Sequence, residues 1–454
     1  MSKKIFAVFL ILLTIVSCNK MEKVNEVIYI QMHETQLTFS TKNHALDNND
    51  NFSPDGKYLC YDTRATVYNE NLANCKSIEK VEISTGKETI LWEPPFVTGE
   101  KAAPGVAAVS FHPKENKVIF IHGPFLDKVN ERGYYDIRNR NGVEVDGEGK
   151  GIITKIDLRD IKKQNTIPGA QRGGTHRHEY SRSGNRIGFT YDDFILQNYE
   201  RTIGYMEQND KAPKGYTHYF SVILKPAEKG KSKPGEIEKA NDDSWVDSLG
   251  TMRAFIGKVR AENGIDYFTD LFVADIPLDV DITTCFSGNE KEYPTPPKGL
   301  SIRRLTHGFN ASGIVRGSQD GELIAFTAQD KNGTKQLFII ESKGNSKEPI
   351  KVTNSESDIS NVRWYLNEWI FYLSDGNVFV SNVSKKNFGK TFQLTKDKKE
   401  RTQLVISQDG NRAAFDIPTE TRDAETKLVK DAAGNDMKQI YIMDLDWNKI
   451  KANL

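Results

Sequence analysis

The sequence has little cysteine, no net charge and only one long apolar run. Its 454 residues include four Cys, and 62 Lys plus Arg are balanced by 62 Asp plus Glu. Without an excess of one charge, the chain has no global field for nucleic acid, so a charged partner must be bound by a local patch. No Cys-x-x-Cys pair is present, which removes the argument for a zinc ribbon or a thioredoxin-like site.

Motifs of several familiar enzyme classes are also missing. The chain has no Gly-x-Ser-x-Gly nucleophile elbow and no P-loop, so neither a propeller-linked serine peptidase nor a nucleotide hydrolase is predicted. The glycines between 147 and 151 do not join a strand to a helix and are interpreted as a turn. A nucleic-acid partner is excluded because no basic stripe with interleaved aromatic residues appears.

The first eighteen residues predict an export signal followed by a lipid anchor. Lys3 and Lys4 precede an apolar run over 5–16 that is too short for a comfortable membrane span. The run ends in Ile-Val-Ser-Cys18, which resembles the bacterial lipobox. The resemblance implies cleavage before Cys18 and acylation of its thiol, so the mature protein would be attached to a membrane of the bacterial cell envelope, on its periplasmic or outer-membrane face.

Three cysteines remain in the predicted mature chain, at Cys60, Cys75 and Cys285. An odd number leaves at least one thiol unpaired. A disulfide between Cys60 and Cys75 stays open at this point, and three unpaired thiols are the simpler expectation.

A strand–turn–strand unit recurs along the chain. Its clearest copy is Phe52-Ser-Pro-Asp-Gly-Lys-Tyr-Leu-Cys-Tyr61. Weaker copies begin at Phe111, Tyr180, Ser318 and Ser407, and two units without the turn lie at 252–275 and 362–372. The Asp-Gly or Asn turns supply the positive φ of tight hairpins, and the flanking residues alternate with period two. These units predict an all-β fold, a seven-bladed β-propeller with about 60 residues per blade.

The ends of the ring need a closing strand. The segment 36–39 forms a strand without a blade, and we expect it to pair with the C-terminal strand 439–444 in the last blade. The stretch 225–250, rich in Lys, Gly and Glu, is predicted to be a solvated loop. The domain assignment is a signal peptide at 1–17, a lipid-anchored tether at 18–35 and the propeller at 36–454.

The Ser-Pro-Asp-Gly-Lys pattern resembles the blade repeats of TolB-type propellers. The chain as a whole, over residues 36–446, is similar to an uncharacterised family of envelope propellers that is often labelled Tol-like. The resemblance implies an envelope protein that binds a membrane or protein partner. A propeller fold by itself does not determine a function.

A second resemblance lies in the histidines. The segments around His122 and around His176-Arg-His178 look similar to segments of oligogalacturonate lyases, propellers that hold a manganese-type divalent ion with three His and a Gln. In a strand, residues i and i+2 share a face, so His176 and His178 are expected to point the same way, with His122 on the neighbouring blade. Three neutral imidazoles suit a first-row divalent ion. Gln171 is a fourth ligand only if its spacing fits, and the alternative is simple hydrogen bonding inside the channel.

The loop after His122 is rich in arginine and tyrosine. Its substrate-binding candidates are Arg132, Tyr134, Tyr135, Arg138 and Arg140. Arginines bind carboxylates in bidentate fashion, and tyrosine rings offer flat faces to a sugar, so the loop suits an acidic oligosaccharide. The alternative is a solvated loop between blades.

Two hypotheses follow. The first is a binding or interaction propeller that is anchored through Cys18 and presents its channel to a glycan or a protein. The second is a metal-dependent, lyase-like enzyme acting on uronic-acid oligosaccharides, in which the ion acidifies a C–H bond and a base removes the proton. Arg64, His112 and His218 are conceivable bases, and the sequence does not choose among them. Enzyme activity therefore stays open.

Overall fold

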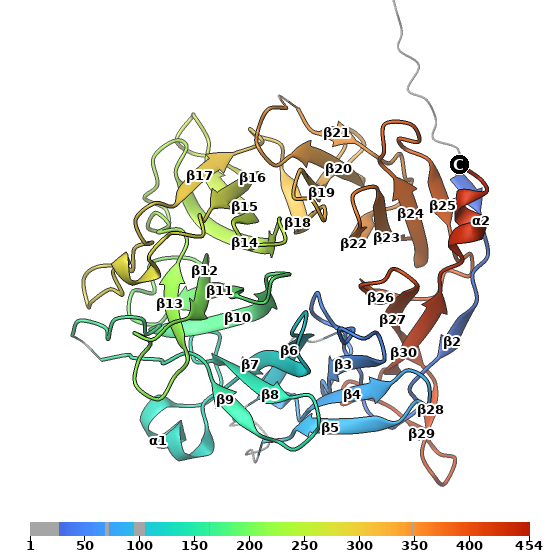
Figure 1. The fold of residues 1–454 in the computed structure, drawn as a ribbon, viewed down its shortest axis with the longest axis horizontal. Coiled ribbons are helices and arrows are strands. Elements are labelled where there is room, and N and C mark those ends of the chain that lie inside the picture. Colours follow the sequence, from blue (N-terminus) through green and yellow to red (C-terminus); the bar gives the residue numbers. More distant parts are fainter. Residues whose placement is uncertain (1–26, 69–71, 95–104, 163, 347) are drawn as a thin grey trace, which may run out of the picture.

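The computed structural model describes residues 27–454 except 69–71, 95–104, 163 and 347. Seven β-sheets are arranged radially around a central axis (Figure 1), which confirms the predicted seven-bladed propeller. The expected signal peptide and Cys18 lie outside the described residues.

The first four blades follow one another along the chain, and in blades 2 to 4 the first strand lies nearest the axis (Figure 1). In blade 1 the segment 45–52 lies on the axis side of the first named strand, with bridges from Ala45 to Asp62 and from Phe52 to Leu59. Blade 1 contains β3 (Tyr58–Asp62), β4 (Ile78–Glu82) and β5 (Glu88–Trp92), with the short helix η1 (Leu72–Asn74). Blade 2 contains β6 (Val106–Phe111), β7 (Lys117–His122), β8 (Asn141–Asp146) and β9 (Ile153–Lys155), with η2 (Leu126–Lys128) and α1 (Val129–Arg132). Blade 3 contains β10 (Gly173–Tyr180), β11 (Arg186–Asp193), β12 (Thr202–Gln208) and β13 (His218–Val222). Blade 4 contains β14 (Ile237–Trp245), β15 (Met252–Arg260), β16 (Tyr267–Asp275) and β17 (Ser301–Arg304), with η3 (Ile282–Thr284).

The last three blades complete the ring, and two of them include strands from the N-terminal part. Blade 5 contains β18 (Ala311–Gly317), β19 (Leu323–Gln329), β20 (Lys335–Glu341) and β21 (Ile350–Lys351). Blade 6 contains β22 (Ile359–Tyr365), β23 (Trp369–Ser374), β24 (Asn377–Asn382), β25 (Thr391–Gln393) and β1 (Val27–Tyr29). Blade 7 contains β26 (Thr402–Ile406), β27 (Arg412–Thr419), β30 (Met437–Asp444) and β2 (Glu34–Gln36). Two small elements are attached to blade 7. A hairpin of β28 (Thr421–Arg422) and β29 (Leu428–Val429) lies between β27 and β30 in the chain, and the helix α2 (Trp447–Lys451) follows β30.

The repeated turn has a common hydrogen-bond pattern. The serine Oγ donates to the Asp Oδ1 two residues later in the Ser53–Asp55 (2.7 Å), Ser318–Asp320 (2.6 Å) and Ser407–Asp409 (2.6 Å) pairs. The glycine after each Asp has a positive φ, as at Gly56, which explains the Asp-Gly preference. In blade 2, His112 takes the place of serine, and its Nδ1 accepts from the Glu115 N–H (2.9 Å).

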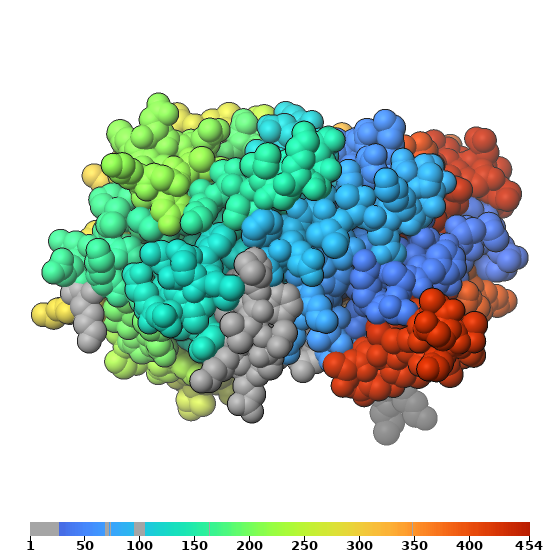
Figure 2. Space-filling model, turned by 90° about the horizontal axis from the view of Figure 1, so that it is seen from below, coloured from blue at the N-terminus to red at the C-terminus, as the bar shows by residue number. Residues whose placement is uncertain are grey.

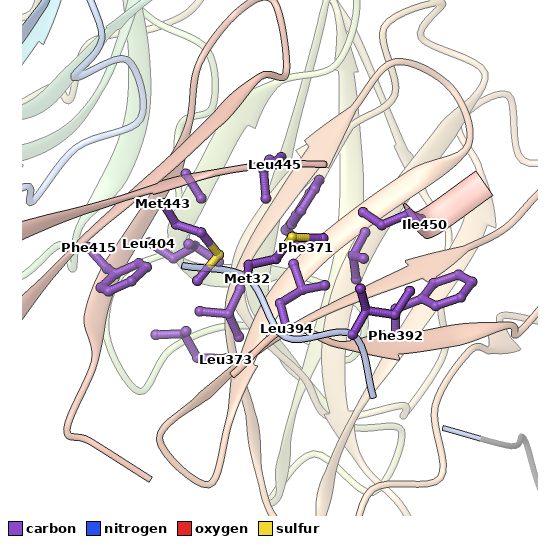
Figure 3. Packing of buried hydrophobic residues seen from close by; sticks show 14 of the residues in the cluster. Met32, Phe371, Leu373, Phe392, Leu394, Leu404, Phe415, Met443, Leu445 and Ile450 are labelled. Carbon is purple, nitrogen blue, oxygen red and sulfur yellow. The ribbon is translucent and has the colours of Figure 1, made fainter. Parts of the chain in front are cut away.

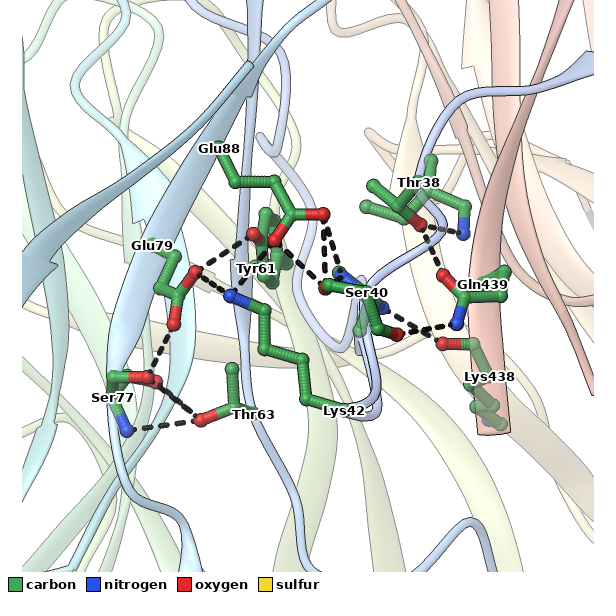
Figure 4. Close-up of polar contacts among 12 residues, drawn as sticks. Thr38, Ser40, Lys42, Tyr61, Thr63, Ser77, Glu79, Glu88, Lys438 and Gln439 are labelled. Atoms are coloured by element: carbon green, nitrogen blue, oxygen red, sulfur yellow. Dashed lines mark hydrogen bonds and ion pairs between the residues drawn. The ribbon is translucent and has the colours of Figure 1, made fainter. Parts of the chain in front are cut away.

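The N-terminal segment closes the ring, as predicted. Glu34 lies opposite Met443 in the antiparallel pair of β2 with β30, and the edge-on view in Figure 2 shows N-terminal residues (blue) beside C-terminal residues (red). The next residues bridge blades 7 and 1 through side chains (Figure 4): Thr38 donates to Gln439 (2.8 Å) and Lys42 pairs with Glu88 (2.8 Å). The propeller begins before residue 36, because β1 is already part of blade 6.

A hydrophobic cluster between blades 6 and 7 holds this closure together (Figure 3). Met32 packs there with Phe371 and Phe392 of blade 6 and with Phe415 and Met443 of blade 7. Side chains of the N-terminal segment therefore fill the inter-blade space, which contributes hydrophobic stabilisation to the join.

The structure tests two local predictions, the solvated loop at 225–250 and the disulfide between Cys60 and Cys75. The stretch 225–250 is a solvated loop only in part: residues 229–236 are largely exposed, but β14 within the stretch is the innermost strand of blade 4. Polar residues of β14, among them Asn241 and Asp242, line a pocket of the central channel. Cys60, Cys75 and Cys285 are all free, so no Cys60–Cys75 disulfide forms.

Candidate functional site

The innermost strands of blades 2 to 7 share an irregularity that shapes the central channel. Each carries a register shift and a residue with φ between 52° and 74°. These residues are Ala108, Arg177, Asp242, Gly313, Asn361 and Gln403. A β-bulge re-aims the side chains that follow it, and here it directs polar groups of otherwise apolar blades towards the axis.

Two arginines lie inside the channel, between its two ends, at a place that we call the waist. Arg316 of β18 and Arg363 of β22 follow the bulges and are only 5% and 7% exposed. Arg363 donates to Val362 O (3.0 Å) and Asn48 O (3.4 Å). Its Nε and that of Arg316 have no partner among the described residues. Buried N–H groups are nearly always hydrogen-bonded, so two orphaned guanidinium donors at one place need an explanation.

The waist is open from both ends. We call the end at the Ser-x-Asp-Gly turns the hairpin mouth and the other end the opposite mouth. A pocket of about 490 Å³ at the hairpin mouth is lined by residues that include Asp50, Glu179, Arg182, Arg316, Arg363 and Trp364. Smaller pockets of about 190 and 230 Å³ at the opposite mouth share Arg177, and Arg316 lines one of them and Arg363 the other. Solutes can therefore approach the two arginines from either mouth.

The nearby carboxylates pair unevenly with these arginines: Glu179 lies within ion-pair distance of Arg316, whereas Arg363 has no such partner among the described residues. Glu179 accepts from Arg253 Nη1 (3.1 Å) and Ser244 Oγ (2.8 Å), while Arg316 is 3.8 Å away. Among the described residues no carboxylate lies within 4.0 Å of Arg363. Burial lowers the pKa of Arg363 well below its usual value, and the neighbouring Arg316 and Arg177 act in the same direction, against the opposing effect of Asp50 and Glu179.

Asp50 is the titratable acid of the site. Burial, together with the charge of Glu179, raises the pKa of the Asp50 carboxyl to about 6, against the opposing effect of Arg316. The negative charge beside the two arginines therefore changes around pH 6, because the Asp50 carboxyl is protonated below that pH and ionised above it. The arrangement is suited to holding an anion of appropriate shape.

The three predicted metal-ligating histidines occupy three different environments. His122 is buried, stacks on Phe125 (4.3 Å between ring centroids) and donates from Nδ1 to Gly123 O (2.6 Å). His178 is buried between blades 2 and 3, where it hydrogen-bonds Thr175 Oγ1 (3.0 Å). His176 instead lines the smaller pocket at the opposite mouth.

The bulge explains why His176 and His178 diverge. The register of β10 against β11 shifts between His176 and Glu179, and Arg177 has φ 56°, so the period-two alternation is broken at these residues. Burial lowers the pKa of His122 to about 4 and that of His178 to about 3, which keeps both rings neutral. No group of three His, Cys, Asp or Glu that could hold a metal occurs among the described residues, so the expected convergence is not formed there.

Gln171 and the conceivable bases are engaged elsewhere. Gln171 accepts from Gly173 N (2.6 Å) and donates to Arg140 O (3.2 Å). Arg64 is ion-paired with Asp62 (2.9 Å). His112 supports its blade turn, and His218 Nδ1 hydrogen-bonds the neighbouring Thr217 (2.8 Å).

The arginine-rich loop is fastened to blade 3. Arg132 donates to Arg159 O (2.6 Å) and Arg138 to Asp193 O (2.9 Å). Arg140 is 3% exposed and donates to Tyr135 Oη (2.9 Å), while Tyr134 is 38% exposed. The five candidates therefore do not share one face, and two of the arginines hold the loop in place.

The sequence-based reasoning did not find Arg316 and Arg363. A usable signal was present, because each is a charged residue inside a strand two or three positions before a blade turn, in Ile-Val-Arg316-Gly and Asn-Val-Arg363-Trp. A charge at a channel-facing strand position is unusual without a partner.

Comparison with known proteins finds relatives without an assigned activity. A family model described as a protein of unknown function (DUF3748) matches residues 105–214. The uncharacterized protein YidR of Escherichia coli (strain K12) is 28% identical over 420 residues, which cover 86% of this chain and 96% of that protein.

Solved structures with a similar arrangement are distant in sequence. An oligogalacturonate lyase from Vibrio parahaemolyticus matches with TM-score 0.41 and 12% identity, over 94% of this chain and 99% of that chain. TolB from Acinetobacter baumannii matches with TM-score 0.36 and 11% identity, over 72% of this chain and 64% of that chain. A prolyl endopeptidase structure matches with TM-score 0.48 and 11% identity, over 89% of this chain but 50% of its own length. TolB-like propellers and an oligogalacturonate lyase are thus among the structural neighbours.

No helix in the described part of the chain has the length and apolar character of a membrane span.

Proposed function

We propose that this protein is an envelope propeller, anchored through Cys18, whose channel binds a carboxylate-bearing glycan. The observation that carries the proposal is the pair of buried arginines, Arg316 and Arg363, with unpartnered Nε groups at the waist. Among the described residues the two Nε donors are unpaired and the Arg363 charge has no carboxylate within ion-pair distance, and leaving such groups buried without a partner is costly. A ligand carboxylate would offer the planar, bidentate acceptor that a guanidinium prefers.

The wall of the hairpin-mouth pocket favours a sugar as the carrier of the carboxylate. Trp364 lines the pocket beside the arginines, and its Nε1–H has no partner among the described residues. The other two aromatic residues of the lining pack against protein groups, since Arg253 lies over the Trp245 ring (4.8 Å to the centroid) and the Tyr365 ring stacks on Trp447 (5.3 Å). An indole ring combines an apolar face with a polar edge, which suits the alternating C–H and O–H groups of a pyranose ring. An acidic peptide would use the same arginines but would not need the Trp364 ring beside them.

Titration calorimetry of the purified protein with uronic-acid oligosaccharides tests the proposal. We expect saturable binding that weakens with added salt, because the interaction is between charges. The matched neutral oligosaccharides, which lack only the carboxylate, should bind at least about tenfold more weakly, the loss expected when a charge-assisted hydrogen bond is absent. Equal affinity for the acidic and neutral series would contradict a role for the arginines.

Binding is also expected to depend on pH through Asp50. Its raised pKa of about 6 means that the carboxyl is neutral below that pH and charged above it, so a negative charge appears beside the ligand as pH rises. We expect the affinity for an acidic ligand to fall several-fold between pH 5 and pH 8. For each unit by which the bound ligand raises the pKa of Asp50, the affinity falls by about a factor of ten. Isothermal titrations across this range measure the effect. Asp50→Asn keeps the shape of the side chain and should remove the pH dependence, whereas an unchanged profile in that variant would assign the titration to another group.

A further inference from the structure

A group of lysines lies at the outer corner of blades 6 and 7, on the same side as the hairpin mouth. The loop 383–390 joins β24 to β25, and Val383 N donates to Glu368 O (2.8 Å) in the turn between β22 and β23. Tyr365, at the start of that turn, lines the hairpin mouth. The loop therefore belongs to the hairpin-mouth face of the propeller.

The C-terminal helix α2 is part of the same surface. The ring of Trp447 stacks on Tyr365 (5.3 Å between centroids), and its Nε1 donates to Gly410 O (2.7 Å) in the blade 7 turn. Lys390 Nζ donates to the carbonyl of Leu454. Loop 383–390 and the C-terminus are consequently in direct contact, and Figure 1 shows α2 beside β25 at the rim.

This corner carries an excess of positive charge. We call it the lysine corner and define it by Lys385, Lys386, Lys390, Lys449 and Lys451. The acidic side chain within these two segments is Asp446, 3.5 Å from Lys449. In the part of the chain that the structure describes, Lys385, Lys386 and Lys451 have no carboxylate within ion-pair distance. Phe388, between the lysines, is 39% exposed.

The chain enters the propeller at this corner. Val27, the first residue of β1, lies opposite Thr391, which directly follows the loop 383–390. Residues 19–26 separate it from Cys18, and a fully extended chain of about eight residues reaches at most about 28 Å. An acyl group on Cys18 would therefore keep the lysine corner close to the bilayer.

We propose that the lysine corner binds the anionic headgroups of the membrane that holds the anchor, so that the hairpin mouth is turned towards the bilayer. This proposal rests on the anchor at Cys18 assigned under the proposed function. Lysines near an anionic lipid surface are attracted to it, and an exposed aromatic side chain among them suits the interfacial region. The acyl chains would supply attachment, and the lysine corner would set the orientation.

Co-sedimentation with lipid vesicles tests the inference. The predicted mature chain, residues 18–454 with Cys18→Ser, carries neither an acyl group nor the apolar segment 5–16, and it is mixed with vesicles that contain phosphatidylglycerol or with vesicles of phosphatidylcholine alone. We expect binding to the anionic vesicles that declines with salt, and at least about tenfold weaker binding for Lys385→Glu with Lys386→Glu in the same background. The matched control, Lys331→Glu with Lys214→Glu, changes the same charge at exposed positions of blades 5 and 3 and should bind like the parent.

The outcomes separate this inference from the channel proposal. Equal vesicle binding by the two double variants, or equal binding to both lipid compositions, would overturn the lysine corner. Uronate titration of the lysine-corner variant should be unchanged, since those side chains do not line the channel. A chain that binds vesicles as expected but fails to bind any uronate would leave the lysine corner standing and refute the channel ligand.

Discussion

The Arg363→Met variant is expected to be more stable than the parent protein and to bind uronate at least about 30-fold more weakly. Arg363 is 7% exposed, and within the described chain its guanidinium has two weak-to-moderate bonds to carbonyls and no carboxylate partner. Replacing a poorly compensated buried charge by an apolar side chain of similar length often stabilises a protein, here by about 1–2 kcal/mol. Removing a charged binding partner costs about 2–5 kcal/mol of binding free energy, which is a loss of roughly 30-fold or more.

Chemical denaturation and calorimetric titration on the same samples measure both effects. The control is Arg401→Met, which removes a guanidinium as deeply buried as that of Arg363 but paired with Glu34 (2.8 Å). That variant should lose stability and keep its ligand affinity. A destabilised Arg363→Met protein would indicate that Arg363 is structural, and the channel proposal would lose its main support.

The Arg253→Met variant is expected to show the largest loss of stability. Arg253 is 1% exposed, pairs with Glu179 (3.1 Å) and Asp243, and packs over the Trp245 ring (4.8 Å to the centroid). Its removal would leave the buried carboxylate of Asp243 without its cation and Glu179 with only the more distant Arg316 (3.8 Å). Breaking a buried ion pair from one side typically costs about 3–5 kcal/mol.

The free energy of unfolding in denaturant measures this loss. Lys343→Met is the control, because Lys343 pairs with Glu322 on the surface with both side chains more than half exposed, and no measurable change is expected there. If Arg253→Met is as stable as the control, Glu179 and Asp243 must be neutralised in another way, and the charge balance described for the waist would be incorrect.

The repeated turns were predictable because their cause is local. Ser53, Asp55 and Gly56 form their hydrogen bonds within one turn, and the glycine supplies the positive φ there. The number of blades followed from counting such units. The closure of the ring was predictable as well, since a strand without a blade of its own has to pair with an edge.

The channel was much harder to predict, since the rules for a strand fail where a strand is irregular. The i, i+2 rule placed His176 and His178 on one face, but the bulge at Arg177 separates them. The stretch 225–250 was interpreted as a solvated loop, which is correct for residues 229–236, whereas the polar residues of β14 line a polar channel. Likewise, the arginines of the loop after His122 bind carbonyl groups of residues distant in sequence.

By itself the sequence determined the fold class, the number of blades and the closing strand, since turn chemistry and alternation act over a few neighbouring residues. Only the tertiary structure decided which charges meet. Glu179, Arg316 and Arg363 come from three different blades, and their distances depend on the radial packing of the sheets. Whether a buried arginine finds a carboxylate is set by that packing, and at the waist of this channel Arg363 finds none among the described residues.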